Sequence, residues 1–441
     1  MKKKVPKFPY LLTRGFLYLA LSLYLLYAGS GGYGSIQTAK FSLFIILFGG
    51  YLALMALCTA ELLVVGRLKL PPIKTVFRSS TPTQRAVVLF WLATTAATLL
   101  SSYRGEALLG MSRQEGLLTI SIYCGVFLCV SVFGRMEKGM LLAFGGAMTV
   151  FSVIALLQMQ GYNPLSLYPN GVNYFDADIK YAGSYLGTAG NAGLTAALLC
   201  MAIPLFWVTI LRRKEKERLW LLLPLGLSLA ALLQSKIQAG LLALLLGTLL
   251  TVPTVVSVAE GKRKKLYLAA AALLAAGLIL VALIPVGSGT LYELQQILRG
   301  NWDGDFGTGR IRIWQEVLKQ VPQHLLLGTG PDTMAAAQLL QSAEANGMVF
   351  FVDVAHNEYL NILYHQGVLG LLPYLAALVL SAVQWIKKSP GNGTVAALGA
   401  AVLCYGIQAF FSFSMCQSAG VFWILWALLE RESRLTEEKK P

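Results

Sequence analysis

The sequence predicts an all-α fold, namely a polytopic membrane bundle of about twelve transmembrane helices with a large helical extracytoplasmic loop before the tenth helix. Composition and the distribution of charge carry this prediction. Hydrophobic residues make up 56% of the 441-residue chain, charged residues make up 13%, and the mean hydropathy is +0.63. This is more apolar surface than a soluble core needs, so it indicates a multi-span membrane protein.

Apolar stretches recur along the whole chain. A hydrocarbon core of roughly 30 Å is crossed by a helix of about 17 to 25 apolar residues. Suitable stretches lie near 10–28, 41–65, 86–101, 117–133, 139–158, 189–211, 219–234, 239–258, 266–286, 360–385, 395–411 and 414–429. Since we find no internal repeat and no hydrophilic domain, residues 1–441 are predicted to form a single integral membrane domain.

Lys and Arg concentrate on alternate loops. When the N-terminus is placed in the cytoplasm and the sides then alternate, 27 of the 36 Lys and Arg residues fall on cytoplasmic segments. The acidic residues lean the other way, and Glu61 falls within the second span. The net charge of +15 therefore reports membrane topology rather than nucleic-acid binding, and both termini are predicted to be cytoplasmic.

The cysteines give no sign of a disulfide or a zinc site. All six lie in or beside apolar spans without CxxC or Cys/His ligand spacing, namely Cys58, Cys124, Cys129, Cys200, Cys404 and Cys416.

The longest outer segment, residues 287–358, is predicted to carry the active site, because loops of this length are usually functional or disordered. Its sequence RIRIWQEVLKQV, starting at Arg310, has apolar residues at helical spacing, with Thr308 as a possible cap. Pro322 and the GTGP sequence at 328–331 end that helix. A second helix is predicted from Asp332 to Ala345.

Two arginines lie in the first turn of the predicted loop helix. The free N–H groups of a helix start favour an anion, and Arg310 adds a planar charge suited to phosphate oxygens. Arg312 lies about 200° further around the helix, so the two side chains are not expected to reach the same atom, whereas Trp314 shares a face with Arg310. Alternatively, both arginines contact lipid headgroups or pair with the nearby acidic residues, Asp303 and Asp305.

The chain has three histidines. His324 follows Pro322 in a turn and is expected to face solvent. His365, in a straight helix, would lie roughly 13 Å deeper than His356 and make a polar contact inside the bundle. His356, beside Asn357 at a loop–helix junction, can donate, accept or act as a base, although a simple contact at the helix start is an alternative.

Three further cations lie on predicted outer segments. Lys236 either extends to lipid headgroups or holds a lipid-linked phosphate. Arg104 and Arg113 are candidates for substrate binding, or they form ion pairs with the neighbouring Glu106 and Glu115.

The order of motifs in the large loop resembles that of the O-antigen ligase and polymerase superfamily of bacterial membrane glycosyltransferases. The resemblance rests on GTGRIRIW, LLLGTGPDT and HNEYLNILYHQGVLGLL. It includes Gly309-Arg310 with Trp314, Pro322, Gly328 and Gly330, His356-Asn357, and Gly367 with Gly370. The sequence LGTAGNA at 186–192 is similar to a helix start of the family, and Ser235-Lys236 to a Ser-Arg pair, with Lys in place of the usual Arg.

The resemblance implies transfer of an oligosaccharide from undecaprenyl diphosphate to an acceptor hydroxyl, at the outer face of the bacterial cytoplasmic membrane. The acceptor is a glycan or a lipid-linked glycan. The expected catalytic residues are His356 and Arg310. The expected substrate-binding residues are Lys236, Arg312, Asn357, Trp314, Arg104 and Arg113. Whether the protein is a ligase or a polymerase stays open.

No cofactor and no metal are expected. The family is thought to need none, and the first outer loop, GSGGYGSIQTAK, has no carboxylate, although Asp176 and Asp178 in DAD form a possible exception.

Two other functions remain possible. One is a transporter or flippase of a lipid-linked glycan, although polar residues gather here at one surface rather than near the midplane. The other is an inactive scaffold of a polysaccharide assembly complex.

Overall fold

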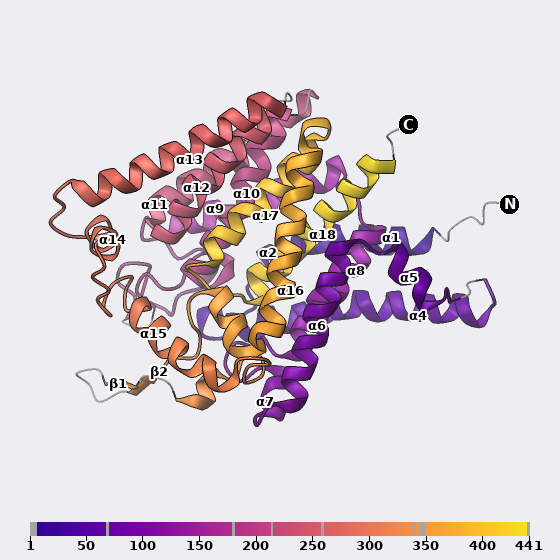
Figure 1. The fold of residues 1–441 in the computed structure, drawn as a ribbon, viewed down its shortest axis with the longest axis horizontal. Helices are drawn as coiled ribbons and strands as arrows, with labels where there is room; N and C mark the ends of the chain where they lie inside the picture. Colours follow the sequence, from indigo (N-terminus) through magenta and orange to yellow (C-terminus); the bar gives the residue numbers. More distant parts are fainter. Residues whose placement is uncertain are drawn as a thin grey trace.

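The computed structural model describes residues 7–67, 70–178, 181–212, 215–256, 260–338, 341–343 and 349–438. Within these ranges the regular secondary structure is helical apart from one pair of short strands (Figure 1). The α-helices are α1 (Phe8–Ala20), α2 (Leu23–Leu26), α3 (Ile36–Phe44), α4 (Gly50–Val64), α5 (Ile73–Ser79), α6 (Pro82–Leu100), α7 (Arg104–Leu109), α8 (Leu117–Phe133), α9 (Lys138–Gln158), α10 (Ala192–Arg212), α11 (Leu222–Ser235), α12 (Gln238–Val256), α13 (Glu260–Leu283), α14 (Thr290–Leu298), α15 (Arg310–Gln320), α16 (Glu358–Lys388), α17 (Gly393–Ala409) and α18 (Cys416–Glu438).

Shorter elements connect these helices. A π-helical turn, η2 (Ile45–Gly49), joins α3 to α4. The 3-10 helices are η1 (Gly32–Gly34), η3 (Pro164–Ser166), η4 (Gly187–Ala189), η5 (Lys216–Leu221), η6 (Val321–His324), η7 (Met334–Ala337) and η8 (Ser389–Gly391). The two strands, β1 (Gln341–Ala343) and β2 (Val349–Phe351), pair antiparallel with Ser342 opposite Phe350.

In the residues that the structure describes, the predicted apolar stretches are mainly helical, although the first is divided between α1 and α2. Nine segments in the described ranges are long and apolar enough to cross a membrane: Phe8–Leu26, Ile36–Val64, Pro82–Leu100, Lys138–Gln158, Ala192–Arg212, Lys216–Ser235, Gln238–Val256, Gly261–Leu283 and Glu358–Gly391. The helices α8 and α17 are apolar but only 17 residues long, and α18 carries charged residues in its second half. A multi-pass helical protein is thus confirmed, whereas about twelve spans stays a prediction.

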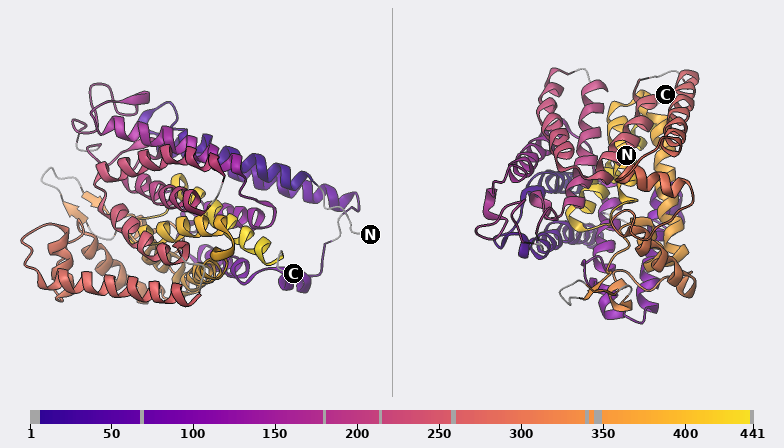
Figure 2. Two further views of the ribbon diagram at one scale, coloured as in Figure 1. Left: turned by 90° about the horizontal axis from the view of Figure 1, so that it is seen from above. Right: turned by 90° about the vertical axis from the view of Figure 1, so that its left-hand side faces the viewer.

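The central helix is α10, whose apolar span is 83% buried. It packs against α17, while α16 packs against α6 and α18 against α8 (Figures 1 and 2). At the other extreme, α13 is only 6% buried and lies along the edge of the bundle beside α12 (Figure 1). From there the chain enters the large loop through α14.

Polar residues at helix starts explain several boundaries. Thr81 and Gln84 form a reciprocal capping box at α6, with Pro82 at the first helical position. Asn392 caps α17, and the Asn191 side chain accepts from the Gly193 and Leu194 N–H groups at the start of α10. The LGTAGNA sequence therefore does begin a helix, as predicted.

Loops predicted to share one side of the membrane do meet. Arg14 pairs with Glu137 at 3.0 Å and Lys138 with Glu217 at 2.7 Å, and all four residues belong to segments assigned to the cytoplasm. The start of α1 and the end of α18 also lie on the same side of the bundle (Figure 1). These contacts agree with the predicted alternation of the loops.

The helix α16 is sharply bent, which corrects the expectation of a straight tenth helix. Gly367 has φ 65° and ψ −169°, outside the helical region. In a straight helix residues 358 and 374 would be about 24 Å apart, yet the Tyr374 hydroxyl donates to Glu358 Oε1 at 2.6 Å. The chain therefore reverses near Gly367. His365 does not lie deeper than His356 along one straight helix, since its carbonyl accepts from Gly330 N of the large loop at 2.9 Å.

Two details of the large loop also differ from expectation. The predicted helix at 310–321 is confirmed as α15, but its N-cap residue is Gly309, with φ 82°, rather than Thr308. The predicted helix from Asp332 to Ala345 is wrong in the described residues, because 334–337 form a 3-10 turn and 341–343 form β1. Asp332 itself has φ 54°, which does not suit a helix start.

Candidate functional site

His356 lies between the large loop and α16 in a left-handed conformation, with φ 49°. Its ring meets the edge of Phe413 with 5.2 Å between the centroids. Burial, followed by the positive charges of Arg310 and Arg113, lowers the pKa of His356 to about 4, while the negative charge of Asp353 acts in the opposite direction. The imidazole is therefore neutral at neutral pH and can accept a proton.

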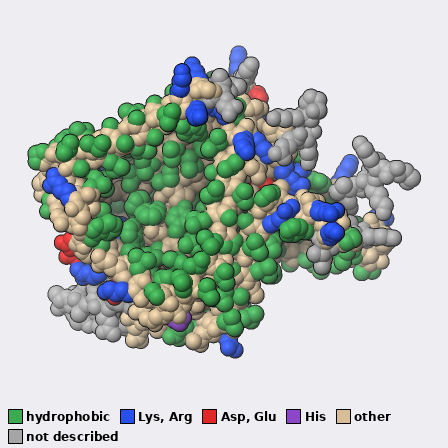
Figure 3. Space-filling model, viewed as in Figure 1, with side chains coloured by type: hydrophobic (Ala, Val, Ile, Leu, Met, Phe, Trp, Pro, Cys, Tyr) green, Lys and Arg blue, Asp and Glu red, His purple; other side chains and the backbone are tan. Residues whose placement is uncertain are grey.

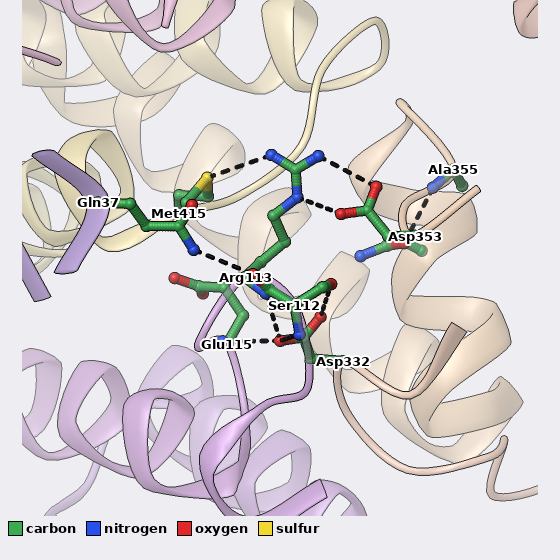
Figure 4. A network of polar contacts seen from close by, with 9 residues as sticks. Gln37, Ser112, Arg113, Glu115, Asp332, Asp353, Ala355 and Met415 are labelled. Carbon is green, nitrogen blue, oxygen red and sulfur yellow. Dashed lines mark hydrogen bonds and ion pairs between the residues drawn. The ribbon is translucent and has the colours of Figure 1, made fainter. Parts of the chain in front are cut away.

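Arg113 and Asp353 form a two-point ion pair beside this histidine (Figure 4). Arg113 Nε donates to Asp353 Oδ2 at 2.6 Å, and Arg113 Nη2 donates to Oδ1 at 3.0 Å. The guanidinium also lies 4.7 Å from the centroid of Phe413, the ring that His356 touches. The expected alternative, a pair between Arg113 and Glu115, is not formed, because Glu115 accepts from the Tyr123 hydroxyl at 2.8 Å.

Asp332 fastens the large loop to the segment that carries Arg113 (Figure 4). Its side chain is 5% exposed and accepts from Arg113 N at 2.8 Å, Ser112 N at 3.2 Å and Ser112 Oγ at 3.0 Å. A longer bond of 3.4 Å comes from Glu115 N. Burial raises the pKa of Asp332, while these donors act in the opposite direction. One carboxylate thus orders a turn more than two hundred residues away in sequence.

Arg310 and Arg312 have different surroundings, as their positions on α15 predict. Arg310 is half-buried, donates from Nη1 to Gly307 O at 3.0 Å and to Thr308 Oγ1 at 3.3 Å, and has a buried Nε without a partner in the described part of the chain. Burial lowers its pKa, although an arginine still keeps its proton. Arg312 is 54% exposed and pairs with Asp305.

Trp314 connects α15 to the chain next to His356. Its indole Nε1 donates to Ala355 O at 2.9 Å, and its ring packs edge-on against Phe410 at 5.6 Å. Ala355 is buried in a small apolar cluster with Val317, Met334 and Tyr364. Trp314 is thus placed to fix the backbone of the residue that precedes His356.

Asn357 and Glu358 start α16. Asn357 is buried, and its Oδ1 caps the helix by accepting from Leu360 N at 3.1 Å. Glu358 is buried and accepts from the hydroxyls of Tyr374 at 2.6 Å and Tyr405 at 3.3 Å. These bonds hold the start of α16 against its own second half and against α17.

A polar cavity of about 60 Å³, large enough for a few water molecules, lies between the ion pair and α16. His365 Nε2 and Gln366 Oε1 are buried and have no hydrogen-bond partner within the described ranges. Both residues line the cavity. The polar part of the cavity lining consists of Arg113, Glu115, Asp332, Asp353, Glu358, Asn361, His365, Gln366 and Ser414.

The glycines of the two motifs lie in backbone contact. Gly330 N donates to His365 O at 2.9 Å, and Val368 N donates to Leu325 O at 2.8 Å. A Cβ on Gly328 would approach His365 C to 2.3 Å, and one on Gly367 would approach Leu326 C to 2.3 Å. Both glycines have positive φ, so the close approach and the conformation each require glycine.

Other predicted site residues lie at the surface. Lys236 is exposed at the end of α11 with φ 54°, Arg104 is exposed and donates to Ser101 O at 3.3 Å, and His324 is exposed as expected. The structure thus gathers His356, Arg113 and Arg310 in one electrostatic neighbourhood, with Asn357 and Trp314 bonded close to His356. Contacts that join Lys236, Arg104 or Arg312 to this group are not seen in the described part of the chain.

The sequence reasoning missed two acidic residues that organise the site, Asp332 and Asp353. Both had a signal, because Asp332 follows the GTGP turn and Asp353 stands three residues before His356. Neither signal identifies the partners, Ser112 and Arg113, which lie between α6 and α8.

Acidic residues elsewhere do not form a metal site in the described ranges, where no three His, Cys, Asp or Glu side chains converge suitably. Asp176 accepts from Asn173 Nδ2 at 2.5 Å.

Comparison with known proteins agrees with the predicted resemblance. The family model described as O-antigen ligase matches residues 184–375, which run from the start of α10 through the large loop into α16. No curated protein matches the chain significantly. The match includes Arg310, Trp314, His356 and Asn357, and so covers the centre of the site described above. Residues 184–375 of this multi-pass membrane protein are therefore similar to the O-antigen ligase family.

Proposed function

We propose that the protein is a glycosyltransferase that moves an oligosaccharide from undecaprenyl diphosphate to an acceptor hydroxyl. The acceptor is a glycan or a lipid-linked glycan, and the reaction takes place at the outer face of the bacterial cytoplasmic membrane, with both termini in the cytoplasm. One observation carries the proposal: within the matched family region, partial burial and the positive charges of two arginines keep the half-buried His356 neutral.

The arginine charges suit a departing diphosphate. As the bond from sugar C1 to the diphosphate oxygen breaks, negative charge grows on the leaving group, so fixed cations stabilise the transition state more than the ground state. Arg310 is our candidate for this role because it is half-buried and has a guanidinium nitrogen without a partner. The exposed Lys236 is proposed as a second cation for the diphosphate, and Arg104 and Arg312 are proposed to bind the outer sugar or lipid groups.

His356 is proposed to take the proton of the acceptor hydroxyl. The hydroxyl oxygen forms the new bond to C1, the diphosphate leaves with the old bonding electrons, and the proton passes to the imidazole. The donor diphosphate would offset the positive charge of the arginines, and this raises the pKa of His356 when the substrate is bound. A single displacement of this kind inverts the configuration at C1. Because arginine and lysine supply the positive charge, the scheme requires neither a metal nor a cofactor.

An apolar groove next to the site is suited to the lipid part of the donor. It has a volume of about 300 Å³ and runs between the second half of α16 and α17, from Tyr359 and Gly406 toward Trp385 and Gly399. Tyr359, at one end of the groove, lies three residues after His356 in the sequence. Small residues in the groove, with no charged side chain in its lining, favour a branched hydrocarbon chain.

The direct test supplies purified protein in bilayer mimics with a lipid-linked oligosaccharide and an acceptor, and measures release of undecaprenyl diphosphate. We expect release by the native protein and a loss of at least about tenfold for His356→Ala, since general base catalysis typically contributes this much or more. His324→Ala is the matched control, because His324 is an exposed histidine of the same loop. Full turnover by His356→Ala would remove the assignment of the base.

The same assay separates the transferase from a carrier. Movement of the intact lipid-linked glycan across the bilayer without cleavage would support a flippase. Absence of both activities in folded protein with its native substrates would support a scaffold.

The acceptor decides between ligase and polymerase. If a strain that lacks the protein loses long glycan chains, the protein extends one lipid-linked chain with another. If long chains accumulate on the lipid carrier instead, it transfers finished glycan to a different acceptor.

A further inference from the structure

A second groove lies at the opposite end of the bundle from the candidate site. Its volume is about 860 Å³, and it is bounded by α5, the first half of α6, the end of α8 and one residue of α18. Arg85 in its wall precedes Ser101 by sixteen residues, or about 24 Å along α6, and Ser101 is the residue that donates to Thr329 of the large loop. The groove therefore belongs to a different membrane face from His356.

The walls of this groove are apolar and its rim is basic. The apolar lining consists of Val76, Phe77, Val88, Leu89, Leu92, Leu128 and Val132, and the polar lining of Ser79, Ser80, Gln84, Arg85 and Arg434. Several of the apolar side chains are strongly exposed, including Phe77 at 59% and Leu89 at 57%. In a helix that crosses a bilayer, such a surface faces hydrocarbon rather than water.

Arg85 is held at the rim in a fixed position. Its Nε donates to Ser80 Oγ at 3.1 Å and its Nη2 to Ser80 O at 2.8 Å, while its guanidinium lies 4.2 Å from the centroid of the Phe77 ring. These two bonds use only part of its five N–H donors. The side chain is thus oriented in advance and keeps donors for an anion.

The charged residues of α5 and of the segments on either side of it are all basic. Residues 66–85 contain Arg67, Lys69, Lys74, Arg78 and Arg85 and no Asp or Glu. Figure 3 shows Lys and Arg side chains gathered on the side of the molecule where α5 lies in Figure 1. On the opposite wall Arg434 is close enough to Glu430 for an electrostatic interaction, so its charge is partly offset. The groove still presents a net positive rim above an apolar floor.

From this combination we infer that the groove binds an anionic glycerophospholipid. One acyl chain lies along Leu89, Leu92 and Val132, and the phosphate accepts hydrogen bonds from Arg85 and Arg434 at the headgroup level. A zwitterionic lipid offers the same hydrocarbon, but its ammonium group is repelled by the arginines. The site is independent of the proposed glycosyl transfer.

The experiment is native mass spectrometry of the full chain in detergent with phosphatidylglycerol or phosphatidylcholine of identical acyl chains. We expect phosphatidylglycerol to be retained at least about tenfold better, since each basic residue near a membrane surface adds a roughly fivefold preference for anionic lipid. The double variant Arg85→Gln with Arg434→Gln should lose this preference. Arg299→Gln, which changes an arginine on a predicted outer segment, should keep it.

A second variant protects the test against misfolding. Leu92→Trp leaves all charges in place but fills the apolar floor, and it should lower retention of phosphatidylglycerol at unchanged melting temperature. Equal retention of the two lipids by the native chain would overturn the inference. So would a preference that survives in the double arginine variant, or displacement of phosphatidylglycerol by undecaprenyl phosphate at equal concentration.

Discussion

Arg113 and Asp353 form a two-point ion pair, at 2.6 and 3.0 Å, between residues 240 positions apart in the sequence. The pair joins the segment between α7 and α8 to the residues just before His356. Both charges act on the pKa of His356 with opposite signs, after the larger effects of burial and of Arg310.

Replacing Arg113 and replacing Asp353 should shift the pH dependence of transfer in opposite directions. His356 must be neutral to act as a base, so kcat/KM of the native protein should fall only as the pH approaches about 4, the value to which the pKa of His356 is lowered. Arg113→Gln removes a nearby positive charge, which raises the pKa and moves the acid limb up by as much as about one pH unit. Asp353→Asn should move it down. A uniform loss of rate with an unmoved limb in both variants would show a merely structural role.

Arg310 and Arg312 offer a matched pair on one helix. Arg310→Gln should lower kcat at least about tenfold, because it removes a charge aimed at the leaving group. Arg312→Gln should change the rate much less, since Arg312 is more than half exposed and already paired with Asp305. Release of lipid diphosphate under saturating donor measures both. Equal losses would mean that the two arginines share the substrate.

Asp332→Ala should lower the free energy of unfolding by about 1–3 kcal/mol, because it leaves the N–H groups of Ser112 and Arg113 without their acceptor. Thermal unfolding in detergent measures this effect. Asp332→Asn, which tolerates the left-handed backbone better than Ala, separates loss of charge from backbone strain. Asp176→Ala, at an exposed aspartate, is the control and should stay within about 0.5 kcal/mol of the native protein.

Gly328→Ala and Gly367→Ala should each destabilise the protein by at least about 1–2 kcal/mol, the typical cost of a left-handed conformation for a residue with a Cβ. The close approach of each new Cβ to backbone at 2.3 Å adds to this cost. Gly146→Ala provides the contrast, because its helical Cβ would meet nothing within 4 Å. That variant should be neutral or more stable. Melting temperatures of the three variants test the contact between the two glycine motifs.

Trp314→Phe keeps an aromatic ring but removes the N–H that donates to Ala355 O. We expect kcat to fall roughly tenfold with little change in KM for the donor, because a small displacement of His356 is enough to slow the step. Trp302→Phe, at a tryptophan that is 58% exposed, should leave kcat unchanged. A rise in KM alone would instead indicate that Trp314 stacks on a sugar.

The sequence by itself predicted most of the helices and the short motifs that the family match includes. An apolar span or a basic loop is a property of a short stretch of sequence and of the bilayer around it, so the sequence predicts it without knowledge of distant contacts. For the same reason α15 and the start of α10 were found correctly, and Arg310, Trp314 and His356 were singled out from motifs that the family match then included.

Only the tertiary structure decided how these motifs meet. Arg113 had two acidic neighbours in sequence, yet its partner is Asp353; Asp332 looked like a helix start, yet it is a buried acceptor for a distant turn. The reversal of α16 at Gly367 depends on backbone contact with Leu325 and Leu326 of the large loop. Pairings of this kind follow from the path of the chain through space, and local hydropathy and spacing carry no information about that path.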